Sequence, residues 1–246
     1  MVVMQEYSGG AFSMSVLVTR PKLGAMRTAK RVQEMGLTPL VLPLSKTVGL
    51  PVNEAALKGE ALIITSEAVF EHMEPRLLQS LKHKDLYCVG PRTAQIAEKF
   101  GFDTIKIIAS TAEKLVASID CSQEIHFLYL AGRVRGPDLE NELLMTHKNL
   151  TVIEIYDTFP LQLTLQEKQK FTQKIKIIML YSALAAKSLE QISSFLNPST
   201  ALLCLSQRIA NAIPVRLCNP TIIAYEPNEE AMLKGLATFL RDKAFD

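Results

Sequence analysis

One order of landmarks occurs twice along this chain: a serine after an apolar run, then a strand-like segment that turns, then another apolar run. The first copy has these landmarks at 65–66, 88–94 and 105–108, and the second has them at 181–182, 204–210 and 221–224. Each landmark of the second copy follows its counterpart by 116 residues, as Ser182 follows Ser66. The segments 16–20 and 127–133 also match, with an offset of 111. The duplication predicts two similar αβ units, and we expect a cleft between them to bind a ligand.

Length and composition agree with two globular units. The chain has 246 residues, which allows two units of about 110 to 120 residues, a common domain size. Hydrophobic residues make up 48% and charged residues 21%, as is ordinary for a soluble protein. The net charge of +2 is far from the clustered basic excess of nucleic-acid-binding proteins. No apolar stretch approaches the roughly 20 residues of a transmembrane helix, so we expect neither nucleic acid nor membrane as a partner.

The N-terminus and the cysteines indicate a reducing cytoplasm. Residues 1–13 lack a charged start followed by an apolar core, so we predict no signal peptide and expect disorder there. The four cysteines show no metal-type spacing; they are Cys88, Cys121, Cys204 and Cys218. Cys88 and Cys204 fall at matching places on predicted strands, where cysteine behaves as a small apolar residue.

Strand-like and helix-like runs alternate, which is typical of parallel sheets with helices on both faces. The predicted strands are 16–19, 62–65, 86–89, 105–108, 127–130, 152–156, 177–180, 201–205 and 222–224, and 39–44 is extended. The predicted helices are 25–35, 68–81, 91–100 and 137–147, with one more after each strand of the second copy.

The alternation leaves two domain arrangements open. In the first, two tandem domains divide near 120–123. In the second, the first strand and helix pack with the last three αβ units, and the middle of the chain is an inserted domain. The crossings between domains would then lie near Pro43 and Pro160.

Loops rich in Ser, Thr, Gly and Arg follow the predicted strands. In parallel αβ sheets, ligands bind outside the carboxyl ends of the strands, where free backbone N–H groups and helix dipoles favour anions such as carboxylates. The alternative is that each hydroxyl only caps its helix. Because six loops share this character, we favour binding; they are Thr19-Arg20-Pro21, Thr65-Ser66, Gly90-Pro91-Arg92, Gly132-Arg133, Tyr181-Ser182 and Ser206-Gln207.

Three further side chains are candidates. Arg133 and Arg135 lie in a loop between a strand and a helix, where a guanidinium can clamp a carboxylate with two hydrogen bonds; a solvated loop is the alternative. Tyr156 ends a strand near a proposed crossing. A phenol with a pKa of about 10 stays protonated at neutral pH and can donate a proton to a leaving hydroxyl, although tyrosines on strands more often simply pack.

The sequence contains no motif of a metal site, a serine hydrolase or a nucleotide-binding protein. The histidines His72, His83, His126 and His147 have no partner at metal-ligand spacing. The chain has no GxSxG elbow, no Walker loop and no GxGxxG motif. What remains is a cofactor-independent enzyme for an anionic substrate.

With these motifs in this order, the chain resembles the uroporphyrinogen-III synthase family from about 15 to 240. The resemblance lies in 17–21 (LVTRP), 36–39 (GLTP), 42–43 (LP), 64–66 (ITS), 68–69 (AV), 89–94 (VGPRTA), 128–133 (LYLAGR) and 156–158 (YDT). Two places depart from the family pattern. The motif 206–210 reads SQRIA and lacks the expected hydroxyls at Arg208 and Ile209, and the loop at 65–66 is one residue short.

The resemblance implies an α/β fold of two flavodoxin-like parallel-sheet domains joined by a two-stranded connector, the first domain discontinuous. Domain 1 would comprise 1–42 plus 161–246, and domain 2 would comprise 43–160. The connector would contain 40–44 and 153–158, so that Tyr156 lines the cleft. The implied protein is a cytoplasmic monomer without metal or organic cofactor, in transient contact with hydroxymethylbilane synthase.

The implied reaction closes hydroxymethylbilane, a linear tetrapyrrole with eight carboxylates, into uroporphyrinogen III. The hydroxyl of ring A leaves to give an azafulvene, ring D attacks through a spiro intermediate, and the ring closes with ring D inverted. Tyr156 would be the acid. The expected substrate contacts are Thr19, Arg20, Thr65, Ser66, Gly90, Arg92, Gly132, Arg133, Arg135, Ser182 and Ser206. The alternative function is a non-catalytic binding or regulatory protein for an anionic small molecule.

Overall fold

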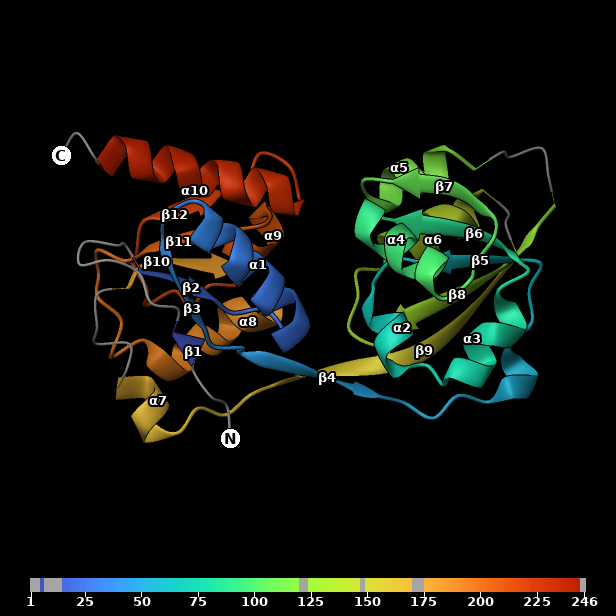
Figure 1. Cartoon of the computed structure of the whole chain (residues 1–246), viewed down its shortest axis with the longest axis horizontal. Helices are drawn as coiled ribbons and strands as arrows, with labels where there is room; N and C mark the ends of the chain where they lie inside the picture. Colours follow the sequence, from blue (N-terminus) through green and yellow to red (C-terminus); the bar gives the residue numbers. More distant parts are fainter. Residues whose placement is uncertain (1–4, 7–14, 120–123, 147–148, 170–174, 244–246) are drawn as a thin grey trace. The chain divides into compact units, whose positions relative to one another are not determined.

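The computed structural model of the chain describes residues 5–6, 15–119, 124–146, 149–169 and 175–243. The chain divides into two compact units (Figure 1). Unit 1 comprises Met1–Lys46 and Phe159–Asp246, and unit 2 comprises Thr47–Thr158. Unit 1 is therefore discontinuous in sequence. Among the helices of the described residues, none is long and apolar enough to cross a membrane.

Unit 1 is built on a sheet with the order β1-β3-β2-β10-β11-β12. Its strands are β1 (Gln5–Glu6), β2 (Ser15–Val18), β3 (Thr38–Val41), β10 (Ile175–Leu180), β11 (Ala201–Cys204) and β12 (Thr221–Ile223). β1 is antiparallel to β3, and the other pairs are parallel. The parallel strands, numbered along the chain, follow the order 2-1-3-4-5, which is the flavodoxin order.

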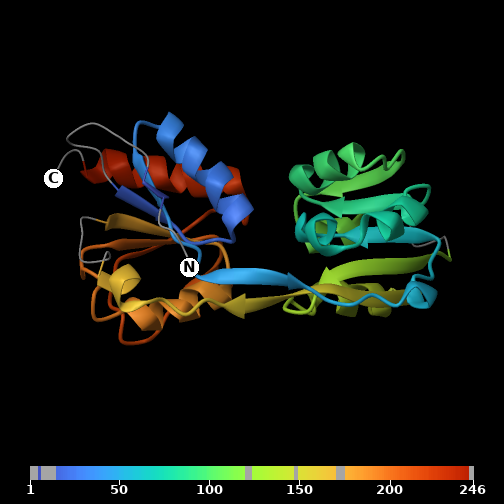
Figure 2. The same cartoon turned by 60° about the horizontal axis from the view of Figure 1, so that its bottom comes forward.

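Helices cover both faces of the unit 1 sheet, as the alternating side chains of its strands require. The elements are α1 (Lys22–Glu34), α7 (Leu165–Gln169), α8 (Ala183–Ser188), η3 (Leu189–Ile192), α9 (Gln207–Ala210) and α10 (Glu229–Lys243). Val16 and Val18 of β2 pack in one core cluster with α1 and α10, whereas Leu17 packs in another with α8, η3 and α9. Figure 2 shows these two helix layers on opposite sides of the sheet.

Unit 2 repeats this architecture in a permuted chain order. Its sheet has the order β4-β9-β8-β5-β6-β7, and β5 to β9 are parallel. The strands are β4 (Ser45–Gly49), β5 (Ala61–Ile64), β6 (Asp85–Val89), β7 (Ile105–Ala109), β8 (His126–Gly132) and β9 (Asn149–Pro160). When β8 is numbered 1, β9 is numbered 2 and β5, β6 and β7 are numbered 3 to 5, the order of the parallel strands across the sheet is again 2-1-3-4-5. Because of this permutation, β2 of unit 1 corresponds to β8 of unit 2, with an offset of 111 residues, whereas β5 of unit 2 corresponds to β10 of unit 1, with an offset of 116.

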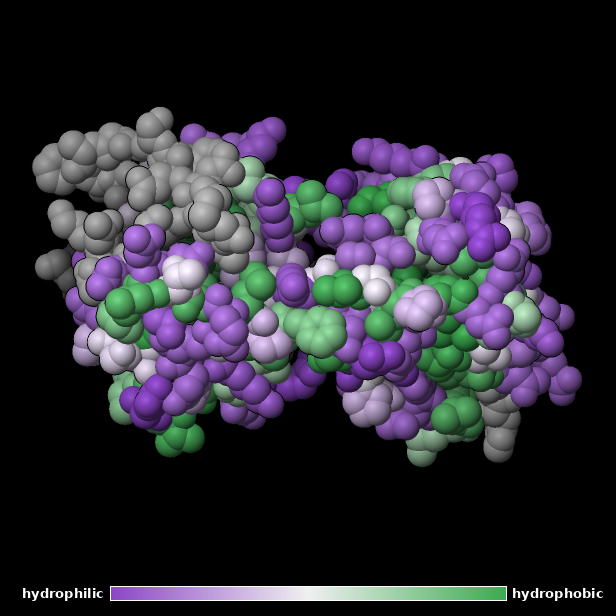
Figure 3. All heavy atoms as spheres, turned by 90° about the horizontal axis from the view of Figure 1, so that it is seen from below, coloured by the Kyte–Doolittle hydropathy of each residue, from purple (hydrophilic) through white to green (hydrophobic). Residues whose placement is uncertain are grey.

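The helices of unit 2 also form two layers. They are η1 (Glu54–Ala56), α2 (Ala68–His72), α3 (Pro75–Leu81), α4 (Pro91–Lys99), α5 (Ala112–Ala117) and α6 (Asp138–Met145). One core cluster joins the sheet to α2, α3 and α4, and the other joins it to α5 and α6. On the face of each unit that Figure 3 shows, hydrophobic and hydrophilic residues are interspersed, as on ordinary protein surfaces. The structure thus confirms the predicted α/β fold class with parallel sheets.

Several predicted elements are wrong in their bounds. The helix expected at 68–81 is two helices, because Pro75 has no backbone N–H and disfavours helix at the residue before it. Met73 and Glu74 are accordingly extended, with ψ of 137° and 132°. The strand expected at 152–156 is the longer β9, and the short helix α5 was not expected.

The crossings between the units, at Lys46–Thr47 and Thr158–Phe159, are close to the expected Pro43 and Pro160, but the residues expected in the connector differ. Leu40 and Val41, expected in the connector, belong to β3 and pair with β2 inside unit 1. The chain instead passes between the units in β4 and at the end of β9, which are neighbouring strands (Figure 2). Disorder was expected for 1–13, but Gln5 and Glu6 form β1; the remainder of that segment lies outside the described residues.

Candidate functional site

The order of strands reverses at one place in each sheet, and ligands bind at the carboxyl ends of strands beside such a place. In unit 2 it lies between β5 and β8. Thr65 and Ser66 follow β5, Gly132 ends β8, and Tyr156 is the register partner of Gly132 on β9. The structure therefore brings these four predicted residues together at one edge of the unit 2 sheet.

Tyr156 is the most enclosed of these polar residues. The residue is 9% exposed and belongs to the core cluster with α2, α3 and α4. The His72 ring lies beside it, with a centroid separation of 5.8 Å, and His72 Nε2 is 2.7 Å from Thr47 Oγ1. Burial raises the pKa of the Tyr156 phenol, while a hydrogen bond with the Ser66 side chain lowers it by less. The phenol therefore stays protonated at neutral pH.

Tyr129 is a second buried phenol at the same edge, and sequence reasoning missed it. It lies on β8, and its hydroxyl is 3.0 Å from Thr65 Oγ1. Burial raises the pKa of Tyr129, and the hydrogen bond with Thr65 opposes this shift. The feature of the sequence that could have indicated this residue is the tyrosine in the motif 128–133, because the strand residues beside it are apolar. Thr65 is thereby held in place by a strand side chain.

Arg133 and Arg135 are already paired with carboxylates of their own unit. Arg133 Nε donates to Glu154 at 2.7 Å and its Nη1 donates to Asp157 at 3.3 Å. Arg135 contacts Glu140 and also donates to Glu154 at 3.2 Å. The hydrogen bond from Arg133 lowers the pKa of Glu154. Both arginines thus bind carboxylates, and the half-exposed Arg133 keeps a face open to solvent.

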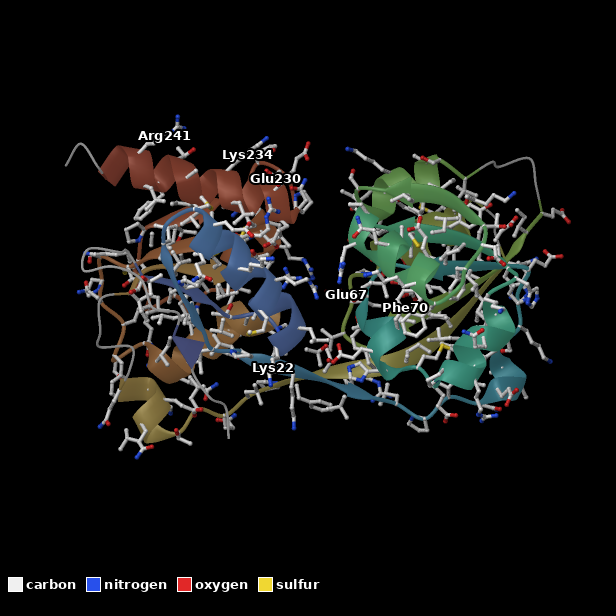
Figure 4. All side chains as sticks on the ribbon, viewed as in Figure 1. Lys22, Glu67, Phe70, Glu230, Lys234 and Arg241 are labelled. Carbon is white, nitrogen blue, oxygen red and sulfur yellow. The ribbon has the colours of Figure 1, made fainter. Side chains whose placement is uncertain are left out.

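The loop after β6 holds Gly90 and Arg92. Gly90 has φ of +84° and precedes α4, while Arg92 Nε lies 3.5 Å from Glu67, which Figure 4 labels. The Gly90 N–H is not free, because it donates to the Ala109 carbonyl at 2.8 Å. The Arg133 N–H is not free either, because it donates to the Tyr156 carbonyl at 2.8 Å.

In unit 1 the strand order reverses between β2 and β10, and Thr19, Arg20 and Ser182 lie at that place. Thr19 is fully buried, and its hydroxyl donates to the Met179 carbonyl at 2.7 Å. Arg20 Nη1 donates to Glu229 at 2.8 Å. The Ser182 hydroxyl accepts a hydrogen bond from the Ala185 N–H at 3.1 Å and so caps α8.

Ser206 lies at the next strand end, after β11, and precedes α9 without a side-chain cap bond. Ile209, where family members are expected to have a hydroxyl, is 2% exposed and belongs to the core. The isoleucine that stands in place of the expected hydroxyl residue therefore packs in the hydrophobic core of unit 1.

The cysteines Cys88 and Cys204 are fully buried on β6 and β11, as expected. Burial raises the pKa of each thiol to about 12, which leaves them protonated. Cys121 and His147 lie outside the described residues. Within the described part of the chain, no group of three or more His, Cys, Asp or Glu side chains is placed to hold a metal ion.

Comparisons with known proteins agree on one family. The family model described as Uroporphyrinogen-III synthase HemD matches residues 26–234. The crystal structure of uroporphyrinogen-III synthetase from Helicobacter pylori is 19% identical, with a TM-score of 0.63 over 93% of this chain and 100% of that one. A mutant uroporphyrinogen III synthase from the extremely thermophilic bacterium Thermus thermophilus is 15% identical, with a TM-score of 0.55 over 94% and 100%. These structures bear on the fold alone. No curated protein sequence matches the chain significantly.

Proposed function

Because this chain belongs to the uroporphyrinogen-III synthase family, we propose that it closes linear hydroxymethylbilane into uroporphyrinogen III. The reaction proposed is loss of the terminal hydroxyl as water, followed by ring closure with inversion of ring D. It needs no metal or organic cofactor in this proposal. We place it in the cytoplasm, in a monomer that receives substrate through transient contact with hydroxymethylbilane synthase.

The observation that carries this proposal is the environment of Tyr156. Departure of the hydroxyl requires a proton, and a group that supplies it must be protonated at the working pH. Tyr156 meets this requirement because burial raises the pKa of its phenol. It also lies at the edge of the sheet where ligands of such folds bind. We therefore assign Tyr156 as the acid.

The substrate carries carboxylates, and the loops around Tyr156 offer donors for them. We propose contacts from Thr65 and Ser66, whose hydroxyls lie at the same edge, and from Arg133, which is half exposed. Arg133 already binds two carboxylates of the chain, so a substrate carboxylate would share or replace one of them. The remaining proposed contacts are Thr19, Arg20, Gly90, Arg92, Gly132, Arg135, Ser182 and Ser206.

Positioning is as important as proton donation in this proposal. The uncatalysed closure proceeds without inversion of ring D, so the enzyme must favour the strained route over the direct one. Groups that hold the substrate in a reactive geometry lower the barrier of that route selectively. Rigid strand ends such as those of β5 and β8 are suited to this task.

The test is to supply the purified protein with fresh hydroxymethylbilane, oxidise the products and separate the porphyrin isomers by chromatography. We expect isomer III in excess over a control without protein. Isomer I alone, from protein that is folded by circular dichroism, would overturn the proposal. A non-catalytic binding protein would then be the better description.

A further inference from the structure

A carboxylate of the protein itself fills a polar site at the carboxyl edge of the unit 1 sheet. Glu229, the first residue of α10, accepts a hydrogen bond from Arg20 Nη1 through Oε2 and one from Thr28 Oγ1 through Oε1, both at 2.8 Å. The donors come from two elements, because Arg20 follows β2 and Thr28 lies on α1. The arrangement binds both oxygens of a carboxylate, as a site for a carboxylate ligand would.

The Arg20 guanidinium is held in place independently of Glu229. Its Cζ lies 4.5 Å from the centre of the Tyr181 ring, a stacking contact that favours a cation. On another side it passes Gly24, where an added Cβ would lie only 2.4 Å from Nε and 2.9 Å from Cζ. The guanidinium therefore occupies room that exists because residue 24 is glycine, and its position is set by β2, α1 and β10 together.

The Tyr181 hydroxyl is the unused donor at this site. It is buried and makes no hydrogen bond of ordinary geometry among the residues that the structure describes, while Thr28 and Glu229 lie close enough to affect its pKa. Burial raises the pKa of this phenol first, and the nearby Glu229 carboxylate raises it further, so the group keeps its proton. A buried hydroxyl without a partner destabilises the folded protein. Its presence beside a carboxylate site is explained if a ligand accepts its hydrogen bond.

Glu229 is free to leave without loss of the helix that begins there. Asn228 precedes it, and the Asn228 Oδ1 accepts the hydrogen bond from the Ala231 N–H at 2.8 Å, which caps α10. The Arg20 and Glu229 side chains are 26% and 28% exposed, so solvent reaches the pair. Glu229 can therefore turn away while α10 stays capped.

We propose that Arg20, Thr28 and Tyr181 form a binding site for one carboxylate of the substrate, which Glu229 occupies in the free protein and leaves when the ligand binds. The identity of the ligand as a polycarboxylate tetrapyrrole rests on the proposed function. The location agrees with the place where the strand order of unit 1 reverses, between β2 and β10.

The test compares Glu229→Ala with Glu230→Ala in the full-length protein, with uroporphyrin III as a stable octacarboxylate probe. Glu230 is the matched control: it is the next residue of α10, labelled in Figure 4, and it pairs with Arg31 on the exposed surface. Its removal reports the general effect of one fewer negative charge on a polyanionic ligand. We expect Glu229→Ala to bind the probe about tenfold more tightly than Glu230→Ala, because a charged hydrogen-bonded competitor is removed.

Two further variants make the interpretation specific. Adding Arg20→Ala to Glu229→Ala should abolish the gain, because the site then lacks its cation. Tyr181→Phe should leave the melting temperature unchanged or higher and weaken probe binding about fivefold, since the hydroxyl makes no hydrogen bond of ordinary geometry in the free protein. If Glu229→Ala does not fold, Glu229→Gln replaces it, with the same expected direction.

Equal affinities of Glu229→Ala and Glu230→Ala would overturn the inference, and so would weaker binding by Glu229→Ala, which would mean that Glu229 only positions Arg20. The formation of isomer III by the unaltered protein tests the proposed function separately. A protein that makes isomer III but shows no gain in Glu229→Ala refutes this inference alone. A protein that makes none refutes the proposed function, while the binding comparison still decides the carboxylate site.

Discussion

The Tyr156 ring packs against Gly132 so closely that no side chain fits at position 132. A Cβ built on Gly132 would lie 2.6 Å from Cζ of Tyr156 and 2.8 Å from its phenol oxygen. The two residues face each other because β8 and β9 are paired, with a shift in register just before Gly132 meets Tyr156. The absence of a side chain at position 132 therefore sets where the proposed acid lies.

Gly132→Ala should displace the Tyr156 phenol and lower the rate of isomer III formation about tenfold or more, since small misplacements of a reacting group are costly. The matched control is Gly136→Ala in the following loop, where the added Cβ would meet only the end of the Asp138 side chain at 3.2 Å. Steady-state kinetics of the two variants decide the matter. Equal rates for both would show that the contact does not position the phenol.

The rate should depend on pH in a direction set by Tyr156. Burial raises its pKa above the ordinary value of 10.0, and the hydrogen bond with Ser66 opposes this shift. An acid acts while protonated, so kcat should hold as the pH rises to about 10 and fall only above it. The contribution of this group to stability has the same sign: it is complete below the unfolded pKa and lost as the pH rises through the folded one.

A profile of kcat against pH tests this expectation, with Ser66→Ala as a second profile. Removing the hydrogen bond that lowers the pKa should move the alkaline limb to higher pH. An alkaline limb below pH 10 that persists in Tyr156→Phe belongs to another group and would contradict the assignment.

Gly90→Ala should cost stability through its backbone. Gly90 has φ of +84°, which side chains rarely adopt, although the nearest atom to an added Cβ, Thr93 Oγ1, is 3.9 Å away. The expected loss is about 1 kcal/mol in the free energy of unfolding, measured by denaturant titration. Gly36→Ala, with φ of +78° and open space around it, should cost a similar amount. A neutral result at both positions would contradict a backbone origin.

The sequence predicts the parts of this protein that depend on local pattern. Apolar runs gave the buried strands β2, β5 and β10, and polar loop residues marked the strand ends where the sheets change order. Pro75 is visible in the sequence, and the single helix predicted over 68–81 is wrong because a helix cannot continue through the residue before it. The length of β9 was not predictable from 152–156 alone, because its exposed ends depend on pairing with β4 and β8.

Long-range pairs account for most of what the sequence does not reveal about the candidate site. Arg20 and Glu229 are separated by 209 residues, and nothing local links an arginine after the first strand to the start of the last helix. Similarly, Arg133 and Glu154 meet because β8 and β9 are neighbours. Thus the sequence indicated which loops carry polar groups, whereas the fold determines which of those groups already have partners.

Tyr156→Phe is the direct test of whether the Tyr156 phenol supplies the proton for departure of the hydroxyl. The substitution removes the hydroxyl and leaves the ring that packs against Gly132 and His72. Rates of isomer III formation should be compared with those of the unaltered protein, alongside melting temperatures as a control for folding. We expect a rate about ten- to a thousandfold lower with little change in stability. An unchanged rate of isomer III formation would contradict it.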